Sequence, residues 1–252
     1  MKIDLHSHIK LTKKTTFSIE YFQESIQEAI SNGLNAIAMT EHFNTYHFHD
    51  IYDSLDRNYT YTEDYYDVDG FKVFPGMEID VKFGGHILVI GTRGAILELR
   101  SRLEPHIEAD EFIAFEQLLD WCDELSLLRI GAHPYRESNS LTQHDPALLR
   151  RLDGFDLNAK DLFSYGPTMR DTVQALAHST GIPMVAGSDT HHPLQFGSII
   201  NELDGEYNKV SELSTCLKQG RYHIIVSPCL EEKVKGANLI KKLLKQHGKV
   251  IM

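Results

Sequence analysis

Asp4-Leu5-His6-Ser7-His8, near the beginning of the sequence, is the stretch from which the fold and the site can be worked out. Residues 1–5 alternate as in a short β-strand, and two histidines follow. Side chains two positions apart lie on the same face of a strand, so both imidazoles can point at one metal ion where the strand meets its loop. A His-x-His pair alone is weak evidence, because surface strands carry such pairs as well.

Other potential metal ligands recur where later hydrophobic runs end. They are Glu41-His42, Glu78, His86, His133 and Asp189-Thr190-His191. All of them except Glu78 and His86 follow the carboxyl end of a predicted strand. This recurrence at one kind of position favours a multi-metal hydrolytic site that is assembled at strand ends.

Segments typical of strands and helices alternate along the sequence. We expect helices at about 18–32, 112–125, 145–151, 167–180, 209–219 and 230–246. We expect strands at 35–40, 71–79 (broken at Pro75-Gly76), 85–91, 127–132, 154–159, 182–186 and 222–226. Residues 43–70 are aromatic and acidic with little periodicity, which predicts a long loop. Repeated strand–helix units predict an α/β fold with parallel strands, helices outside and ligands at the carboxyl ends of the strands.

The composition limits the classes of function. The 252 residues suit a single domain over 1–252, and the net charge of −11 argues against a stable nucleic-acid partner, which normally meets a basic surface. A small phosphorylated substrate remains compatible, because metal ions can supply the positive field. Three cysteines without a CxxC pair predict no disulfide framework. We expect a cytoplasmic protein without a leader or membrane contact, and the oligomeric state stays open.

The types of donor point to divalent metal ions. Histidine nitrogen and carboxylate oxygen suit Zn, Mn or Fe, and the lack of thiolates argues against a closed structural zinc site. A carboxylate such as Glu78 can bridge two ions about 3.5–4 Å apart, the separation found in two-metal phosphatases. Such ions lower the pKa of a bound water, so that hydroxide is available near neutral pH.

Taken together, the motifs resemble those of the PHP (polymerase and histidinol phosphatase) family, in the order of that family. The matching segments are Asp4-Leu5-His6-Ser7-His8, Thr40-Glu41-His42, Gly76-Met77-Glu78, Ala132-His133-Pro134 and Gly187-Ser188-Asp189-Thr190-His191. The resemblance implies a distorted (β/α)7 TIM-like barrel of the PHP type and a stand-alone, metal-dependent phosphoesterase similar to histidinol phosphatases.

The resemblance also implies roles for individual residues. It places a first ion at His6, His8, Glu78 and Asp189, a second at Glu78, His86 and His133, and a third at His42 and His191. Glu78 would bridge the first two ions. His191, or the third ion beside it, would help to protonate the leaving alkoxide. Catalytic roles are thus expected for Glu78, Asp189 and His191.

One segment departs from the family's pattern. Trinuclear members have a His or Asp just beyond the first motif, where this chain reads Ile9-Lys10-Leu11-Thr12-Lys13-Lys14. We therefore expect two or three ions. Two hypotheses address the third position: either His47 or His49 completes it, or the ammonium group of Lys13 lies where the ion would be.

Arg136, which follows His133-Pro134, is the arginine best placed to bind a phosphoryl group, with His192 and Lys160 as weaker candidates. We expect hydrolysis of a small phosphomonoester, such as histidinol phosphate, by attack of a metal-bridging hydroxide. A nucleotide or oligonucleotide phosphoesterase or exonuclease is an alternative, because the aromatic residues of 43–70 offer stacking faces. Alternatives of other kinds are a non-catalytic metal-binding regulatory protein and amidohydrolase chemistry.

Overall fold

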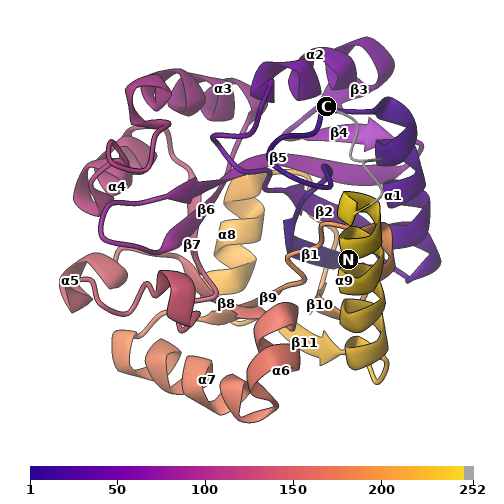
Figure 1. The fold of residues 1–252 in the computed structure, drawn as a ribbon. Coiled ribbons are helices and arrows are strands. Elements are labelled where there is room, and N and C mark those ends of the chain that lie inside the picture. The colour runs from indigo at the N-terminus through magenta and orange to yellow at the C-terminus, as the bar shows by residue number, and fades with distance from the viewer. Residues whose placement is uncertain (247–252) are drawn as a thin grey trace.

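The computed structural model describes residues 1–246 and shows a ring of strands surrounded by helices (Figure 1). The strands are β1 (Lys2–Ser7), β2 (Ala36–Met39), β3 (Thr60–Thr62), β4 (Tyr65–Val68), β5 (Phe71–Asp80), β6 (His86–Ile90), β7 (Leu128–Ala132), β8 (Gly154–Asn158), β9 (Met184–Gly187), β10 (Ile199–Leu203) and β11 (Tyr222–Val226). The helices are α1 (Ile19–Ser31), α2 (Phe48–Asn58), α3 (Arg93–Arg102), α4 (Phe115–Glu124), α5 (Pro146–Leu149), α6 (Ala159–Tyr165), α7 (Thr168–Thr180), α8 (Val210–Lys218) and α9 (Leu230–Gln246). Within residues 1–246, no helix combines the length and the apolar character that crossing a membrane requires.

The wall of the barrel consists of β1, β2, β5, β6, β7, β8 and β9, in that order. A bridge between Ser7 and Thr190 brings the chain after β9 beside β1, so that the ring nearly closes. Strand pairs β1–β2, β2–β5, β7–β8 and β8–β9 are parallel. The distorted barrel expected from the sequence is therefore confirmed. We call the end of the barrel at which these parallel strands finish the mouth.

The expectation of parallel strands does not hold for every strand. β6 is antiparallel to both β5 and β7, and β10 and β11 extend the sheet beyond β1 as antiparallel strands. β4 is also antiparallel, to both β3 and β5. The reason for β6 is the length of its connection, because only the short turn between Asp80 and His86 separates it from β5. A parallel pairing needs a crossover of a dozen or more residues.

The segment 43–70 is not the long loop that its composition predicts. It forms α2 and the hairpin β3–β4, and β4 pairs with β5. Phe48, Ile51, Tyr52 and Leu55 are buried on one face of α2, at the spacing of a helix. This apolar pattern was present in the sequence, although acidic residues are interleaved with it. Pro75 also does not break β5, which runs without interruption from residue 71 to residue 80.

Two apolar layers hold the barrel. The outer layer lies between the sheet and the surrounding helices, and the inner layer fills the ring. In the inner layer, Leu213 and Leu217 of α8 pack with Leu5 of β1 and Leu88 of β6. Figure 1 shows α8 across the ring of strands. The apolar face of α8 thus closes the ring at the end opposite the mouth.

Gly187, the last residue of β9, is where the wall of the barrel is most crowded around a predicted ligand. A Cβ atom added there would overlap the Cβ of His6, and it would lie 2.7 Å from Oδ1 of Asp156. We therefore expect Gly187→Ala to lower the free energy of unfolding by about 1–3 kcal/mol and to displace His6. Chemical denaturation and metal affinity of the variant measure the two effects. Gly94→Ala, where nothing lies within 4 Å of the added atom, is the control. Equal stability of the two variants would contradict the prediction.

Candidate metal centre

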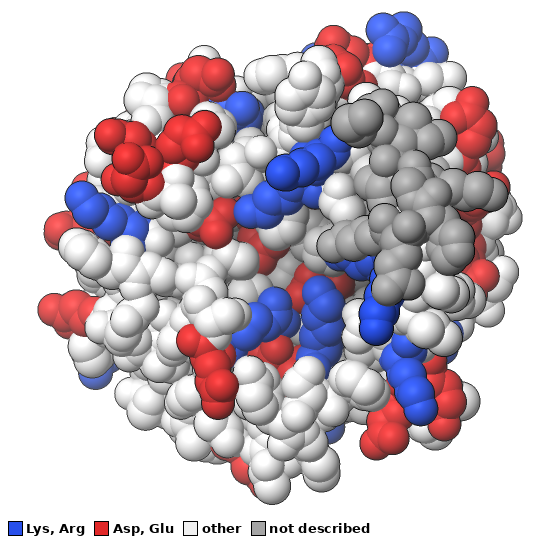
Figure 2. All heavy atoms as spheres, in the orientation of Figure 1, with Lys and Arg blue, Asp and Glu red and all other residues white. Residues whose placement is uncertain are grey.

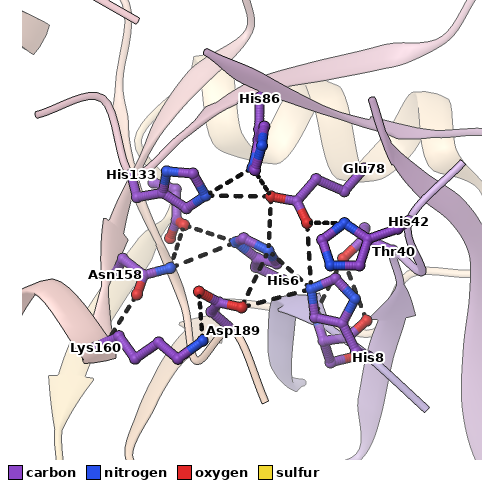
Figure 3. Close-up of polar contacts among 12 residues, drawn as sticks. His6, His8, Thr40, His42, Glu78, His86, His133, Asn158, Lys160 and Asp189 are labelled. Atoms are coloured by element: carbon purple, nitrogen blue, oxygen red, sulfur yellow. Dashed lines mark hydrogen bonds and ion pairs between the residues drawn. The ribbon is translucent and has the colours of Figure 1, made fainter. Parts of the chain in front are cut away.

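The strand ends bring the predicted ligands together at the mouth. Figure 3 shows polar atoms of His6, His8, His42, Glu78, His86, His133 and Asp189 turned toward one another. The sequence did not place Glu78 and His86. Glu78 reaches this point near the carboxyl end of β5, which is parallel to β2, and His86 reaches it because β6 is reversed. His86 begins β6 opposite Asp80 at the end of β5 and opposite Ala132 at the end of β7. The first residue of an antiparallel strand thus lies at the same edge as the last residues of its neighbours.

Three groups of side chains among the described residues offer ligand atoms within 4.8 Å of one another. They are His6–His8–Asp189, Glu78–His86–His133 and His8–His42–His191. The first two agree with ion positions implied by the family resemblance, and the third adds His8 to the expected pair. A neutral imidazole has one lone pair, so His8 can complete only one of its two groups. The geometry therefore offers two complete groups and a third that competes with the first for His8.

Glu78 lies in the middle of this cluster, between histidines of the three groups. Its Oε1 is 2.5 Å from Nδ1 of His86 and 3.1 Å from Nε2 of His133. Its Oε2 is 2.9 Å from Nδ1 of His42 and 3.4 Å from Nε2 of His8. One buried carboxylate thus reaches histidines of all three groups, which is the arrangement that a bridging ligand requires.

Burial and neighbouring charge act on the two central carboxylates in opposite directions. Burial raises the pKa of Glu78, but the surrounding imidazoles, above all His86, outweigh it and hold that pKa well below its usual range. Burial also raises the pKa of Asp189, and the charges of Lys160 and Arg136 outweigh it in the same way. Both groups are therefore ionised at neutral pH, the form in which carboxylates bind metal.

Three of the histidines are held in the neutral form. Burial lowers the pKa of His133 to about 3. Burial is also the main cause that lowers the pKa of His42 and of His191. The charge of His8 lowers both pKa values further. The ammonium groups of Lys13 and Lys160 add smaller contributions, respectively to the pKa of His42 and of His191. A neutral imidazole keeps the lone pair that a metal ion needs.

The polar atoms of the cluster are compatible with bound divalent ions. Oε2 of Glu78 and Nδ1 of His8 and of His42 are buried without a hydrogen bond. These atoms have ion-pair contacts, because Oε2 of Glu78 is 2.9 Å from Nδ1 of His42 and Nδ1 of His8 is 3.5 Å from Oε1 of Glu41. Coordination of an ion would use the lone pairs that hydrogen bonds do not occupy. Imidazole and carboxylate donors without thiolate suit Zn, Mn or Fe. The residues therefore fit a metal centre, while the identity and number of the ions stay predictions.

The sequence analysis missed two carboxylates that contact ring nitrogens of histidines in the cluster. Oδ2 of Asp156 is 2.8 Å from Nδ1 of His6, and Oδ1 of Asp80 is 2.8 Å from Nε2 of His86. A carboxylate that accepts from one ring nitrogen fixes the ring and turns the other nitrogen toward the metal. A signal for Asp156 existed in the sequence, because it is a charged residue inside a predicted buried strand.

The contacts of His47, His49 and Lys13 distinguish the two hypotheses for the third ion position. His47 and His49 are exposed. Nδ1 of His47 lies 3.6 Å from Asp50, and the ring of His49 packs edge-on against Phe48, so the geometry does not favour either histidine as a ligand. By contrast, Nζ of Lys13 is 3.2 Å from Oδ2 of Asp80, directly behind His86.

The guanidinium group of Arg136, predicted to bind phosphate, has three partners in the protein. Nε donates to Asp161 at 2.9 Å, Nη1 donates to Asp189 at 3.0 Å, and Nη2 donates to Asn158 at 3.0 Å. Nζ of Lys160 is 3.2 Å from the same Oδ2 of Asp189. Arg136 therefore supports Asp189 and its surroundings, and its contact with a phosphoryl group stays a prediction.

The position of Asp156 leads to a test of the first group. We expect Asp156→Ala to weaken metal binding about ten- to a hundred-fold, because His6 loses the acceptor that orients its ring. Asp156→Asn retains an acceptor oxygen and should restore part of the affinity. Titration calorimetry of the metal-free protein measures the effect, with the exposed Asp110→Ala as the control. An unchanged affinity in Asp156→Ala would show that His6 needs no orienting partner.

Comparison with known proteins agrees with this geometry. The family model described as PHP domain matches residues 4–227, and no curated protein matches the chain. Among solved structures, PsfC from Pseudomonas syringae PB-5123 is similar with a TM-score of 0.80 and 18% identity, over 96% of this chain and 98% of that chain. The lesion-specific endonuclease PfuEndoQ from Pyrococcus furiosus is similar with a TM-score of 0.66 and 23% identity, over 89% of this chain and 58% of that chain. An amidohydrolase from Chromobacterium violaceum is similar with a TM-score of 0.54 and 15% identity, over 88% of this chain and 97% of that chain.

At such identities the structural likeness concerns the fold, whereas the family match covers most of the chain and includes every predicted metal ligand. The chain belongs to the PHP domain family, and it is a metal-dependent hydrolase.

Proposed function

We propose that this protein hydrolyses small phosphomonoesters. The observation that carries the proposal is the gathering of positive side chains around the metal centre of a protein whose net charge is −11. Lys13, Arg136 and Lys160 each contact a carboxylate at the mouth. Figure 2, in the orientation of Figure 1, shows Lys and Arg side chains around acidic groups in the middle of this face. Such a local positive field attracts an anionic substrate to an otherwise acidic surface.

The residues of the centre suit phosphoryl chemistry. Divalent ions bound there would activate water and neutralise the charge that develops on phosphoryl oxygens. Glu78 reaches both complete groups of ligands, and Asp156 holds the ring of His6 in place. These contacts position the ligands before a substrate arrives, which lowers the cost of reorganisation during the reaction.

His191 suits the role of a ligand better than that of a proton donor. Its Nδ1 lies 3.1 Å from the carbonyl oxygen of Asp189, which can only accept a hydrogen bond. The proton of the neutral ring is therefore on Nδ1, and Nε2 carries the lone pair. The geometry thus does not favour the expectation that His191 protonates the leaving alkoxide.

A nucleotide is the second candidate substrate, and the position of Tyr46 favours it. This side chain is 61% exposed, and the backbone N–H of Tyr46 donates to the carbonyl oxygen of Lys13 at 2.7 Å. The backbone of an exposed aromatic residue thus contacts Lys13, and the Tyr46 ring packs edge-on against the ring of His47 at 4.1 Å between centroids. Stacking of a base on an aromatic face is worth about 1–3 kcal/mol.

The proposed function predicts that the Mn- or Zn-loaded protein releases inorganic phosphate from monoesters, while product formation from the diester and the amide is followed by chromatography. The panel holds histidinol phosphate, nucleoside monophosphates, an aryl phosphate, a phosphodiester and an amide. We expect turnover of monoesters that is lost on chelation and returns when the metal is added back. His6→Ala is the blank, because it removes a ligand of the first group.

The other outcomes separate the alternatives. Faster hydrolysis of the diester than of any monoester would contradict the proposal and favour a nuclease. Hydrolysis of the amide alone would favour amidohydrolase chemistry. A protein that binds its metal firmly and hydrolyses no member of the panel would favour a regulatory, non-catalytic role.

A further inference from the structure

Lys13 lies in the segment that departs from the family's pattern, and its backbone is firmly held. Its carbonyl oxygen accepts from the N–H of Tyr46 at 2.7 Å and from Oγ1 of Thr45 at 3.0 Å. The buried ammonium group of Lys10 donates to the same two residues, to Oγ1 of Thr45 at 2.8 Å and to the carbonyl oxygen of Tyr46 at 2.6 Å. These contacts fix the loop at the mouth, so the position of Lys13 is set by the fold.

The side chain of Lys13 points from this loop to the metal centre. Its Nζ is 3.2 Å from Oδ2 of Asp80, and Oδ1 of Asp80 is 2.8 Å from Nε2 of His86. Because Asp80 accepts at Nε2, the other ring nitrogen, Nδ1, is the atom of His86 that faces Glu78 and His133. Lys13, Asp80 and His86 thus form a continuous chain from the loop to the second group of ligands.

Among residues 1–246, the polar contact of the Lys13 ammonium group is the one with Asp80, which leaves part of its donor capacity. An ammonium has three N–H donors, and the bond to Asp80 uses one of them. The side chain of Lys13 is 37% exposed, compared with 20% for Arg136, whose guanidinium already donates to three protein partners. Of these two candidates, Lys13 therefore has more capacity to bind a further anion at the mouth.

We propose that Lys13 binds the phosphoryl group of the substrate next to the Glu78–His86–His133 group, and that Asp80 is the positioning residue that links this lysine to His86. The proposal rests on the phosphoesterase function and deepens it. A phosphomonoester is mainly a dianion at neutral pH, because its second pKa is about 6, whereas a phosphodiester carries one charge. A fixed ammonium group beside the metal ions strengthens binding of the monoester more than binding of the diester. Lys13 thereby selects for the monoester.

The test separates substrate binding from metal binding by using inorganic phosphate as the probe. Calorimetry of the metal-loaded protein measures phosphate affinity, and elemental analysis after dialysis measures bound metal. We expect Lys13→Ala to weaken phosphate binding about ten-fold, the effect of losing roughly one charge-assisted hydrogen bond, with its metal content unchanged. Lys13→Arg should recover part of the affinity. Lys14→Ala, the exposed neighbour, is the matched control and should bind phosphate as the unmodified protein does.

Substitution of Asp80 should weaken metal binding, whereas substitution of Lys13 should weaken phosphate binding. We expect Asp80→Ala to weaken metal binding about ten- to a hundred-fold, with partial recovery in Asp80→Asn. Asp80→Asn keeps an acceptor oxygen for Nε2 of His86, so its recovery separates orientation of the ring from a purely structural role of Asp80. Equal metal affinity in Asp80→Ala and Asp80→Asn, or an unchanged affinity in Asp80→Ala, would overturn this part of the proposal.

Two results would overturn the role of Lys13. Equal phosphate affinity in Lys13→Ala and Lys14→Ala would show that the ammonium group does not bind the phosphoryl group. Loss of metal in Lys13→Ala as large as in Asp80→Ala would show that Lys13 acts only through Asp80. Neither readout requires turnover, so failure of this inference is distinguishable from failure of the phosphoesterase function. In an active enzyme, Lys13→Ala should also raise KM for a monoester more than for a diester.

Discussion

The structure of the site depends on the compensation of one buried negative charge. Glu78 has a side chain that is 2% exposed, and an ionised carboxylate in such a place is stable only with partners of opposite charge or with hydrogen-bond donors. Imidazoles from four other segments supply these contacts. Each of these segments has to finish or begin at the same end of the barrel. The arrangement of strands is therefore inseparable from the electrostatics of this carboxylate.

The reversal of β6 is the structural step that makes this compensation possible. In a barrel of uniformly parallel strands, the beginning of a strand lies at the end opposite the mouth, and His86 would be remote from Glu78. The short turn after Asp80 reverses the chain at once, so that His86 lies opposite Asp80 itself. The same turn brings Asp80 into contact with Nε2 of His86. A local feature of the chain thus supplies both a ligand and the residue that orients it.

The positive side chains at the mouth likewise compensate the negative charge of carboxylates there. Arg136 and Lys160 both contact Oδ2 of Asp189, while Lys13 contacts Asp80 on the other side of the centre. The carboxylates that bind metal or orient its ligands are thereby held in place before any ion arrives. Because Arg136 is bonded to three partners, it serves mainly to hold these carboxylates in place. Lysines with fewer contacts are then the cations that remain for an anionic substrate.

The sequence by itself determined the family, the barrel and every member of the three ligand clusters. His6, His8 and His133 could be found because each follows a hydrophobic run and lies in a motif whose order along the chain is specific. The helix α2 could also have been found, since its apolar residues have helical spacing. These features are local, and local patterns are visible in a linear sequence.

Only the tertiary structure decided which residues orient the ligands and which carboxylates each cation contacts. Asp156 is 150 positions from His6, and Lys13 is 67 positions from Asp80, so no pattern of spacing connects either pair. The competition of two ligand groups for His8 and the engagement of Arg136 by three partners are likewise invisible before the strands are placed side by side. Each of these facts depends on distances between distant segments, and such distances are set by packing of the whole barrel.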